Sequence, residues 1–159
     1  MSRAWGDRSA AEKAVLNPAA IALAIRAGAV GYQAERGSPM PLALAFLVVA
    51  AVIHRPMREQ LPGTIATSFP TWVLRNPEIR STFGNRVRAI VPAVREGLAI
   101  GANSGAFSLG GGDVVVGEME PARPSGVLVE LTAKAKFVGR WFGRVGDAQT
   151  VMALLGVTP

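Results

Sequence analysis

The sequence predicts a mostly α-helical α+β protein with one small β-hairpin. Two observations carry this prediction. Capping residues followed closely by proline recur along the first half of the chain, and each opens a stretch with apolar residues at helical spacing. Later in the chain, a glycine-rich segment lies between two short apolar runs, which is typical of a hairpin turn.

One domain is predicted over residues 17–159, preceded by an N-terminal arm over residues 1–16. The 159 residues can bury a substantial core, and half of them are hydrophobic. Cysteine is absent, which excludes disulfides and thiolate chemistry and fits a cytoplasmic protein. The first residues carry no apolar run of the kind found in secretion signals.

The first predicted helix begins after Asn17 and ends before Gly37. Asparagine caps free amides, the proline that follows suits the first helical position, and glycine suits a left-handed helix end. Within this helix, Gly28 and Gly31 are expected to let another helix approach closely. A short loop is expected over residues 38–41.

The next segment, Leu42–Ile53, is apolar throughout and predicts a buried helix. It is too short to cross a bilayer, which needs roughly 20 residues, so no membrane contact is expected. Pro56 is expected to break the helix, with one further turn over residues 57–61. A brief helix is expected after Ser68.

A longer helical region is predicted to begin at Asn76–Pro77, which repeats the signal of a cap followed by proline. The pair Gly84–Asn85 predicts an interruption, after which the helix resumes over residues 86–102. Pro92 is expected to kink the resumed helix.

Residues 106–117 are predicted to form the hairpin, because two apolar runs flank Gly110–Asp113. A surface loop is expected over residues 121–124, and Val127–Val129 is predicted as a third short strand. Helices followed by a glycine-turned hairpin give a winged-helix-like pattern, which also occurs in many unrelated α+β domains.

The C-terminal region predicts a two-faced helix that ends near Gly146, and a final short helix capped by Asp147. At 3.6 residues per turn, three basic residues fall on one stripe, five apolar residues fall opposite, and two aromatic residues lie on the border. The stripe is Lys136, Arg140 and Arg144; the apolar face is Leu131, Ala135, Val138, Phe142 and Val145; the border is Phe137 and Trp141.

The formal charge is +6, from 17 basic and 11 acidic residues. Arginine dominates the basic residues, as is typical of GC-rich genomes, so the distribution of charge is more informative than its sum. Residues 113–130 carry four acids and one arginine, whereas residues 131–144 carry four basic groups and no acid. An acidic segment therefore precedes a basic helix, and the two either attract each other or face different partners.

No catalytic residue, cofactor or metal site is predicted. The chain has one histidine and no cysteine, so a histidine cluster or a Cys–His pair cannot form within it. Gly110–Gly112 lacks the Lys and Ser or Thr of a phosphate-binding loop, which favours a hairpin turn. The acidic residues Asp113, Glu118 and Glu120 match no calcium-loop spacing.

Two groups of residues are predicted to bind partners. They are Lys134, Lys136, Arg140, Trp141 and Arg144 on the two-faced helix, and His54, Arg55 and Arg58 after the apolar helix. The helical stripe has three interpretations: a solvated face, docking on an acidic protein surface, or contact with nucleic acid. The aromatic residues on its border are favoured as core or interface anchors. The second group either contacts a partner or phosphate, or stabilises the end of the apolar helix against its dipole, and the two are compatible.

Several blocks of the chain, from about residue 15 to the end, resemble the middle component of bacterial three-component ABC systems. This group includes Lamassu-type anti-phage and anti-plasmid defence. The blocks are Asn17–Pro18 with its helix to Gly31–Tyr32, Pro41–Val49, Ile53–Pro62, Thr67–Ser68 with Trp72, Asn76–Pro77, Arg86–Glu96, Lys134–Phe142 and Leu154–Pro159. The Lys-Ala-Lys-Phe-x-Gly-x-Trp-Phe block and the Gly-Val-x-Pro end are the most specific of them.

The resemblance implies a non-catalytic accessory subunit that links an SMC/RecN-like ABC ATPase to an effector, often a nuclease. Contact with DNA is then expected through the complex. A free-standing winged-helix DNA-binding protein or regulator is the alternative hypothesis, and an enzyme of another type is a third. Tight duplex binding by the isolated chain, steeply dependent on salt, would distinguish the second hypothesis.

Overall fold

The computed structural model describes residues 17–118, 120 and 123–158, so the predicted N-terminal arm lies outside the described residues. The elements are α2 (Pro18–Arg36), β1 (Met40–Pro41), α3 (Leu42–Ile53), α4 (Arg55–Gln60), α5 (Phe69–Arg75), α6 (Pro77–Ser104), β2 (Phe107–Gly110), β3 (Asp113–Val116), α7 (Val127–Val145) and α8 (Ala148–Leu154). The predicted class is confirmed, since 71% of the structure is helical and one small antiparallel sheet completes it.

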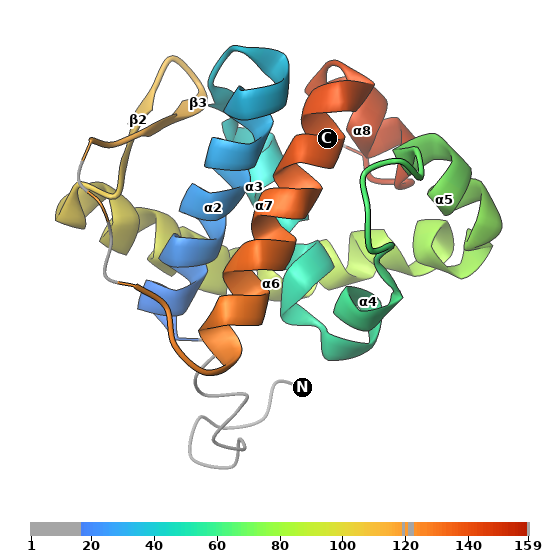
Figure 1. Cartoon of the computed structure of the whole chain (residues 1–159), viewed down its shortest axis with the longest axis horizontal. Helices are drawn as coiled ribbons and strands as arrows, with labels where there is room; N and C mark the ends of the chain where they lie inside the picture. Colours follow the sequence, from blue (N-terminus) through green and yellow to red (C-terminus); the bar gives the residue numbers. More distant parts are fainter. Residues whose placement is uncertain (1–16, 119, 121–122, 159) are drawn as a thin grey trace.

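Helices α2 and α7 lie side by side in the middle of the molecule, and α6 crosses behind them (Figure 1). Glycines make this close packing possible, as the sequence predicted for Gly28 and Gly31. A Cβ at Gly31 would collide with the backbone carbonyl of Lys136, and one at Gly139 would collide with the carbonyl of Gly28. The two backbones therefore touch directly, and any larger residue at either contact would force them apart.

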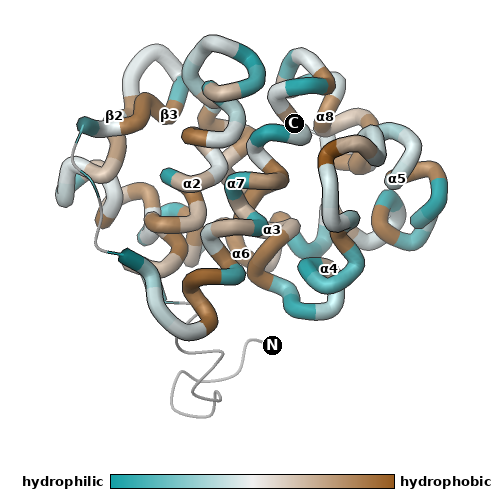
Figure 2. The backbone as a smooth tube through the Cα atoms, viewed as in Figure 1, coloured by the Kyte–Doolittle hydropathy of each residue, from teal (hydrophilic) through white to brown (hydrophobic). Residues whose placement is uncertain are grey.

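Helix α3 forms the centre of the core, as its apolar composition predicted. Eight of its twelve residues are buried, as expected for a helix that is hydrophobic on all sides. Apolar segments of the backbone gather toward the middle of the molecule, whereas α4 at the margin is largely hydrophilic (Figure 2). Among the described helices, none combines the length and apolarity that crossing a membrane requires.

Side-chain caps set three of the seven described helix starts. The side chains of Asn17, Ser68 and Asp147 accept hydrogen bonds from backbone amides at the starts of α2, α5 and α8. Gly37 ends α2 in a left-handed conformation, at φ 78°. Asn76 differs from the prediction, because its side chain makes no cap and instead donates to the carbonyl of Trp72 at 2.8 Å.

Helix α6 is continuous over 28 residues, so the predicted interruption at Gly84–Asn85 is wrong. Buried Phe83 and Val94 anchor the helix on the core on both sides of this pair. Such packing outweighs the roughly 1 kcal/mol that a helical glycine costs. Pro92 lies inside the same helix, on its exposed side.

The sheet has the strand order β1–β3–β2, with both pairs antiparallel. The predicted hairpin is confirmed, and its turn uses positive φ at Gly111 and Gly112. The third strand was wrongly predicted at Val127–Val129, which is the first turn of α7. A three-residue apolar run fits either a strand or a helix. Here Val127 and Leu128 pack against the core, whereas Val129 is 52% exposed.

The actual third strand is β1, inside the segment predicted as a loop. Met40 pairs with Val114 of β3, and both side chains are fully buried. In the chain, β1 lies between α2 and α3, and the hairpin follows α6. Of the predicted loop over residues 121–124, positions 123 and 124 are described, and both are exposed.

Candidate partner-binding surfaces

The predicted two faces of α7 are present in the structure. Leu131, Ala135, Val138 and Phe142 are buried against the core, while Val145 is half-buried. Lys136 and Arg144 are exposed on the opposite side, and Lys134 and Arg140 are half-buried. The helical spacing of apolar residues in the sequence predicts this orientation, because the apolar stripe must pack against the core. We call Lys134, Lys136, Arg140 and Arg144 the α7 basic face; the last three form the stripe, and Lys134 lies about 160° around the axis from Lys136, at the other edge of the exposed side.

Glu35 of α2 anchors two members of the α7 basic face. Arg140 donates from Nε and Nη2 to Glu35 Oε1 at 3.0 and 2.8 Å, and Arg144 Nε donates to Glu35 Oε2 at 3.1 Å. The hydrogen bonds from Arg140 and then Arg144 hold the pKa of Glu35 below its usual value. One carboxylate therefore orients two guanidinium groups and offsets part of their charge.

Sequence reasoning missed Glu35, which lies 105 residues before Arg140. Its position in the last turn of α2 carries no local signal of a partner. Two other residues of the face, Lys134 and Lys136, form no ion pair with any described residue. The uncompensated charge of the α7 basic face is therefore carried mainly by its two lysines.

Trp141 is buried, which corrects its place among the partner-binding residues. Only 2% of Trp141 is exposed, and its indole N–H donates to the carbonyl of Thr67 at 2.8 Å. Its ring lies 5.2 Å from that of Phe69 and 5.1 Å from that of Phe137. The ring joins α7 to α5 inside the core, in agreement with the interpretation as a core anchor.

Arg58 is also buried, which likewise corrects its prediction as a partner-binding residue. Its side chain is 5% exposed, and Nη1 donates to the carbonyl of Val52 at 2.6 Å. Its Nε lies 3.6 Å from a carboxylate oxygen of Glu130. Arg58 thus satisfies a backbone carbonyl at the end of α3, which is the stabilising role that the sequence left open beside partner contact.

His54 and Arg55 remain exposed at the junction of α3 and α4. Partial burial of the ring lowers the pKa of His54, and the nearby cations Arg86 and Arg58 lower it further. Both effects favour the neutral imidazole. Arg55 pairs with Glu59 at 2.8 Å, so this corner carries little net positive charge toward a partner.

The described part of the chain offers few means for chemistry. Among its residues, no group of three or more His, Cys, Asp or Glu is placed to hold a metal ion. A void of about 10 Å³ between α5, α6 and α7 is lined by apolar and aromatic side chains such as Met57, Phe83 and Trp141. It has room for no more than about one water molecule.

Comparisons with known proteins identify the family of the chain. Nothing among the curated proteins or the solved structures matches the chain. The model of one protein family, described as ABC-three component (ABC-3C) system Middle Component 3, matches residues 5–159. The match covers almost the whole chain, including most of the segment predicted as an N-terminal arm. The chain therefore belongs to the family of Middle Component 3 proteins of ABC-three component systems.

Proposed function

We propose that this protein is a non-catalytic subunit that links an SMC/RecN-like ABC ATPase to an effector such as a nuclease. The complex would act in the cytoplasm in Lamassu-type defence. Membership of the family implies an ABC ATPase and further components as partners. The observation that carries the proposal is the α7 basic face, where two exposed or half-exposed lysines lie beside two arginines already held in place by Glu35.

The α7 basic face suits an acidic protein surface. Glu35 restricts Arg140 and Arg144 in the free protein, so less side-chain entropy is lost when a partner binds. Lys134 and Lys136 supply the charge that attracts the partner, and such charges chiefly raise the rate of association and fix its register. His54 and Arg55 are retained as a second, weaker contact because both are exposed.

The proposal is tested by purifying the tagged chain together with the products of its two neighbouring genes. Recovery of a large ATPase in fixed ratio is expected. Replacing Lys134→Gln and Lys136→Gln together should weaken assembly roughly 10-fold, since exposed charge pairs contribute up to about 1 kcal/mol each. The matched control is Arg88→Gln with Arg95→Gln, which removes the same charge from another helix.

Two results would contradict this proposal. Recovery of the chain alone would remove the subunit role, and equal assembly by both double variants would remove the α7 basic face as the docking surface. Reversing Arg140 and Arg144 would be a poorer test, because repulsion between the new acids and Glu35 would disturb the contact between α2 and α7.

A free-standing winged-helix DNA-binding protein is the second candidate function. One observation favours a winged-helix arrangement: β1, placed between the first two described helices, pairs with the second strand of the hairpin that follows α6. In helix-turn-helix proteins the second helix of the motif, the recognition helix, enters the major groove of DNA. This likeness concerns the fold alone, and a DNA-binding function must be argued from particular residues.

A further inference from the structure

Among the described residues, positive charge without an acidic partner is concentrated on α6 and the residues that lead into it. Residues 75–104 contain five arginines and two glutamates, a net charge of +3. The arginines are Arg75, Arg80, Arg86, Arg88 and Arg95. Within the part of the chain that the structure describes, none of them forms an ion pair. The α7 basic face differs, because Glu35 occupies its two arginines.

Three of these arginines form a row along the solvent side of α6. Arg80, Arg88 and Arg95 are exposed, and at 3.6 residues per turn they fall within an arc of about 80°. At 1.5 Å per residue, the row extends over about 22 Å of helix. We call these three residues the α6 arginine row.

The outermost ridge of α6, beside the arginine row, carries small side chains and two acids. Its exposed residues include Ser81, Asn85, Ala89, Pro92 and Ala99, with Glu78 and Glu96 among them. A large apolar side chain, Ile100, is 43% exposed but lies near the end of the helix. The middle of the ridge therefore lacks a large apolar side chain, whereas protein interfaces are usually centred on large aromatic or apolar anchors.

The acids on and near α6 lie to one side of the arginine row. Glu78 and Glu96 lie within the ridge, about 80–100° around the axis from Arg88 and Arg95 and about 160° from Arg80. The hairpin leaves α6 through Gly105, and its acidic residue Asp113 follows the turn at the far end. The exposed acid Glu118 follows β3 back at the end of α6, where the N–H of Gly117 donates to the carbonyl of Ala106. Arg95 lies about 15 Å along α6 from this end.

We propose that the α6 arginine row binds the phosphate backbone of duplex DNA. Arginine presents a planar fork of donors that matches phosphate oxygens. A row about 22 Å long follows several successive phosphates, which are spaced at about 3.4 Å along each strand.

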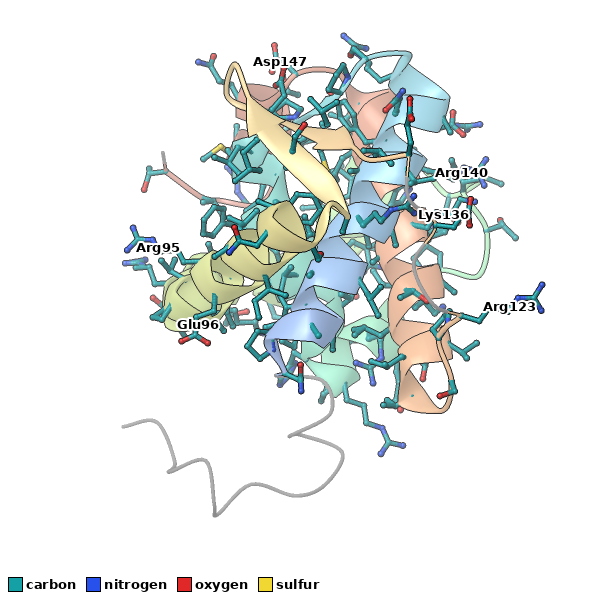
Figure 3. All side chains as sticks on the ribbon, turned by 90° about the vertical axis from the view of Figure 1, so that its left-hand side faces the viewer. Arg95, Glu96, Arg123, Lys136, Arg140 and Asp147 are labelled. Carbon is teal, nitrogen blue, oxygen red and sulfur yellow. The ribbon has the colours of Figure 1, made fainter. Side chains whose placement is uncertain are left out.

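The α6 arginine row and the α7 basic face point in opposite directions. In Figure 3, Arg95 lies on one side of the molecule, whereas Lys136 and Arg140 lie on the other, with α2 between them. The DNA site is thus additional to the proposed docking surface for a protein partner. The two proposals depend on different residues and can fail separately.

The experiment measures binding of the full chain to a fluorescent duplex of mixed sequence by anisotropy, over a series of salt concentrations. Wild type should show a steep salt dependence. Arg88→Gln with Arg95→Gln should make the slope of log K against log[salt] shallower by about 1.8, since each phosphate contributes about 0.9. The same arithmetic gives an affinity lower by about 10- to 100-fold near 0.1 M salt.

Two further variants make the test specific. Lys134→Gln with Lys136→Gln removes the same charge from α7 and should leave the slope nearly unchanged. Glu96→Gln removes an acid next to Arg95 and should raise the affinity. The two double variants and Glu96→Gln all change exposed or half-exposed side chains, so each variant is expected to fold. Circular dichroism checks that they do.

Three outcomes would overturn the proposal. They are failure of the wild-type chain to bind duplex, equal loss of binding in the two double variants, and unchanged binding by Arg88→Gln with Arg95→Gln. If that last variant binds duplex normally but no longer joins the ATPase complex, the α6 arginine row is a protein-docking surface instead.

Discussion

At the scale of single residues, Glu35 determines how much charge the α7 basic face presents. Its carboxylate accepts three hydrogen bonds from Arg140 and Arg144, which are four residues apart on α7. The spacing of the two arginines was predictable from helical periodicity. Their acidic partner was not, because the contact depends on α2 and α7 lying side by side.

Replacing Glu35→Gln should destabilise the protein near neutral pH and have little effect in acid. The folded state lowers the pKa of Glu35 below its usual 4.5. The stabilising contribution is therefore fully present above that value and is lost as the pH falls through the lower, folded-state pKa. Urea unfolding of both proteins at about pH 7 and about pH 3 measures the difference. A difference that stays constant with pH would show that the ion pairs are not its source.

Arg58 and Arg55 provide a second test at this scale, since they are close in sequence but differ in burial. Arg58→Ala should lower the free energy of unfolding by about 3 kcal/mol, because a buried carbonyl loses its donor and a cavity forms. Arg55→Ala, at a side chain that is 79% exposed, should change stability little. Thermal unfolding distinguishes the two variants, and similar losses would contradict the structural role of Arg58.

At the scale of elements, boundaries set by neighbouring residues were predictable, and those set by distant contacts were not. Asn17 and Asp147 cap their helices with their own side chains, so the sequence shows these starts directly. The strand at Met40 forms only because Val114 lies beside it. The continuity of α6 through Gly84 depends on core packing, which local propensity does not contain.

The contact between α2 and α7 should be sensitive to a single methyl group. Gly31→Ala places a Cβ against the backbone of α7, where no side chain can move aside. A loss of about 1–3 kcal/mol is expected, as for other overpacked sites. Gly63→Ala is the control, because a Cβ at Gly63 would meet nothing within 4 Å. Chemical denaturation compares them, and a neutral Gly31→Ala would mean that the helices separate at little energetic cost.

At the scale of the whole molecule, two basic surfaces on opposite sides give the protein the form of a connector. The α7 basic face belongs to the front layer in Figure 1, and the α6 arginine row belongs to the helix behind it. The sequence predicted the first surface from periodicity. It did not indicate the second, because identifying it required knowing which arginines lack acidic partners.

Both surfaces should be occupied at the same time. Adding duplex to the assembled complex should increase its mass without releasing this chain, because the two sites do not overlap. The effects of the two double variants should also be additive, as for distant sites without shared partners. Mass photometry of the mixture measures this. Displacement of the protein partner by DNA would show that the two ligands compete for one surface.

The paired indoles of the core have a practical consequence. The rings of Trp72 and Trp141 lie 5.3 Å apart at an angle of 54°. Their N–H groups donate to the carbonyls of Gln60 and Thr67, close to the two ends of the segment that joins α4 to α5. Two chromophores at this separation couple optically, so their near-ultraviolet dichroism and emission depend on how α5 is seated. The protein thus contains an intrinsic, label-free optical probe of whether a partner moves that helix.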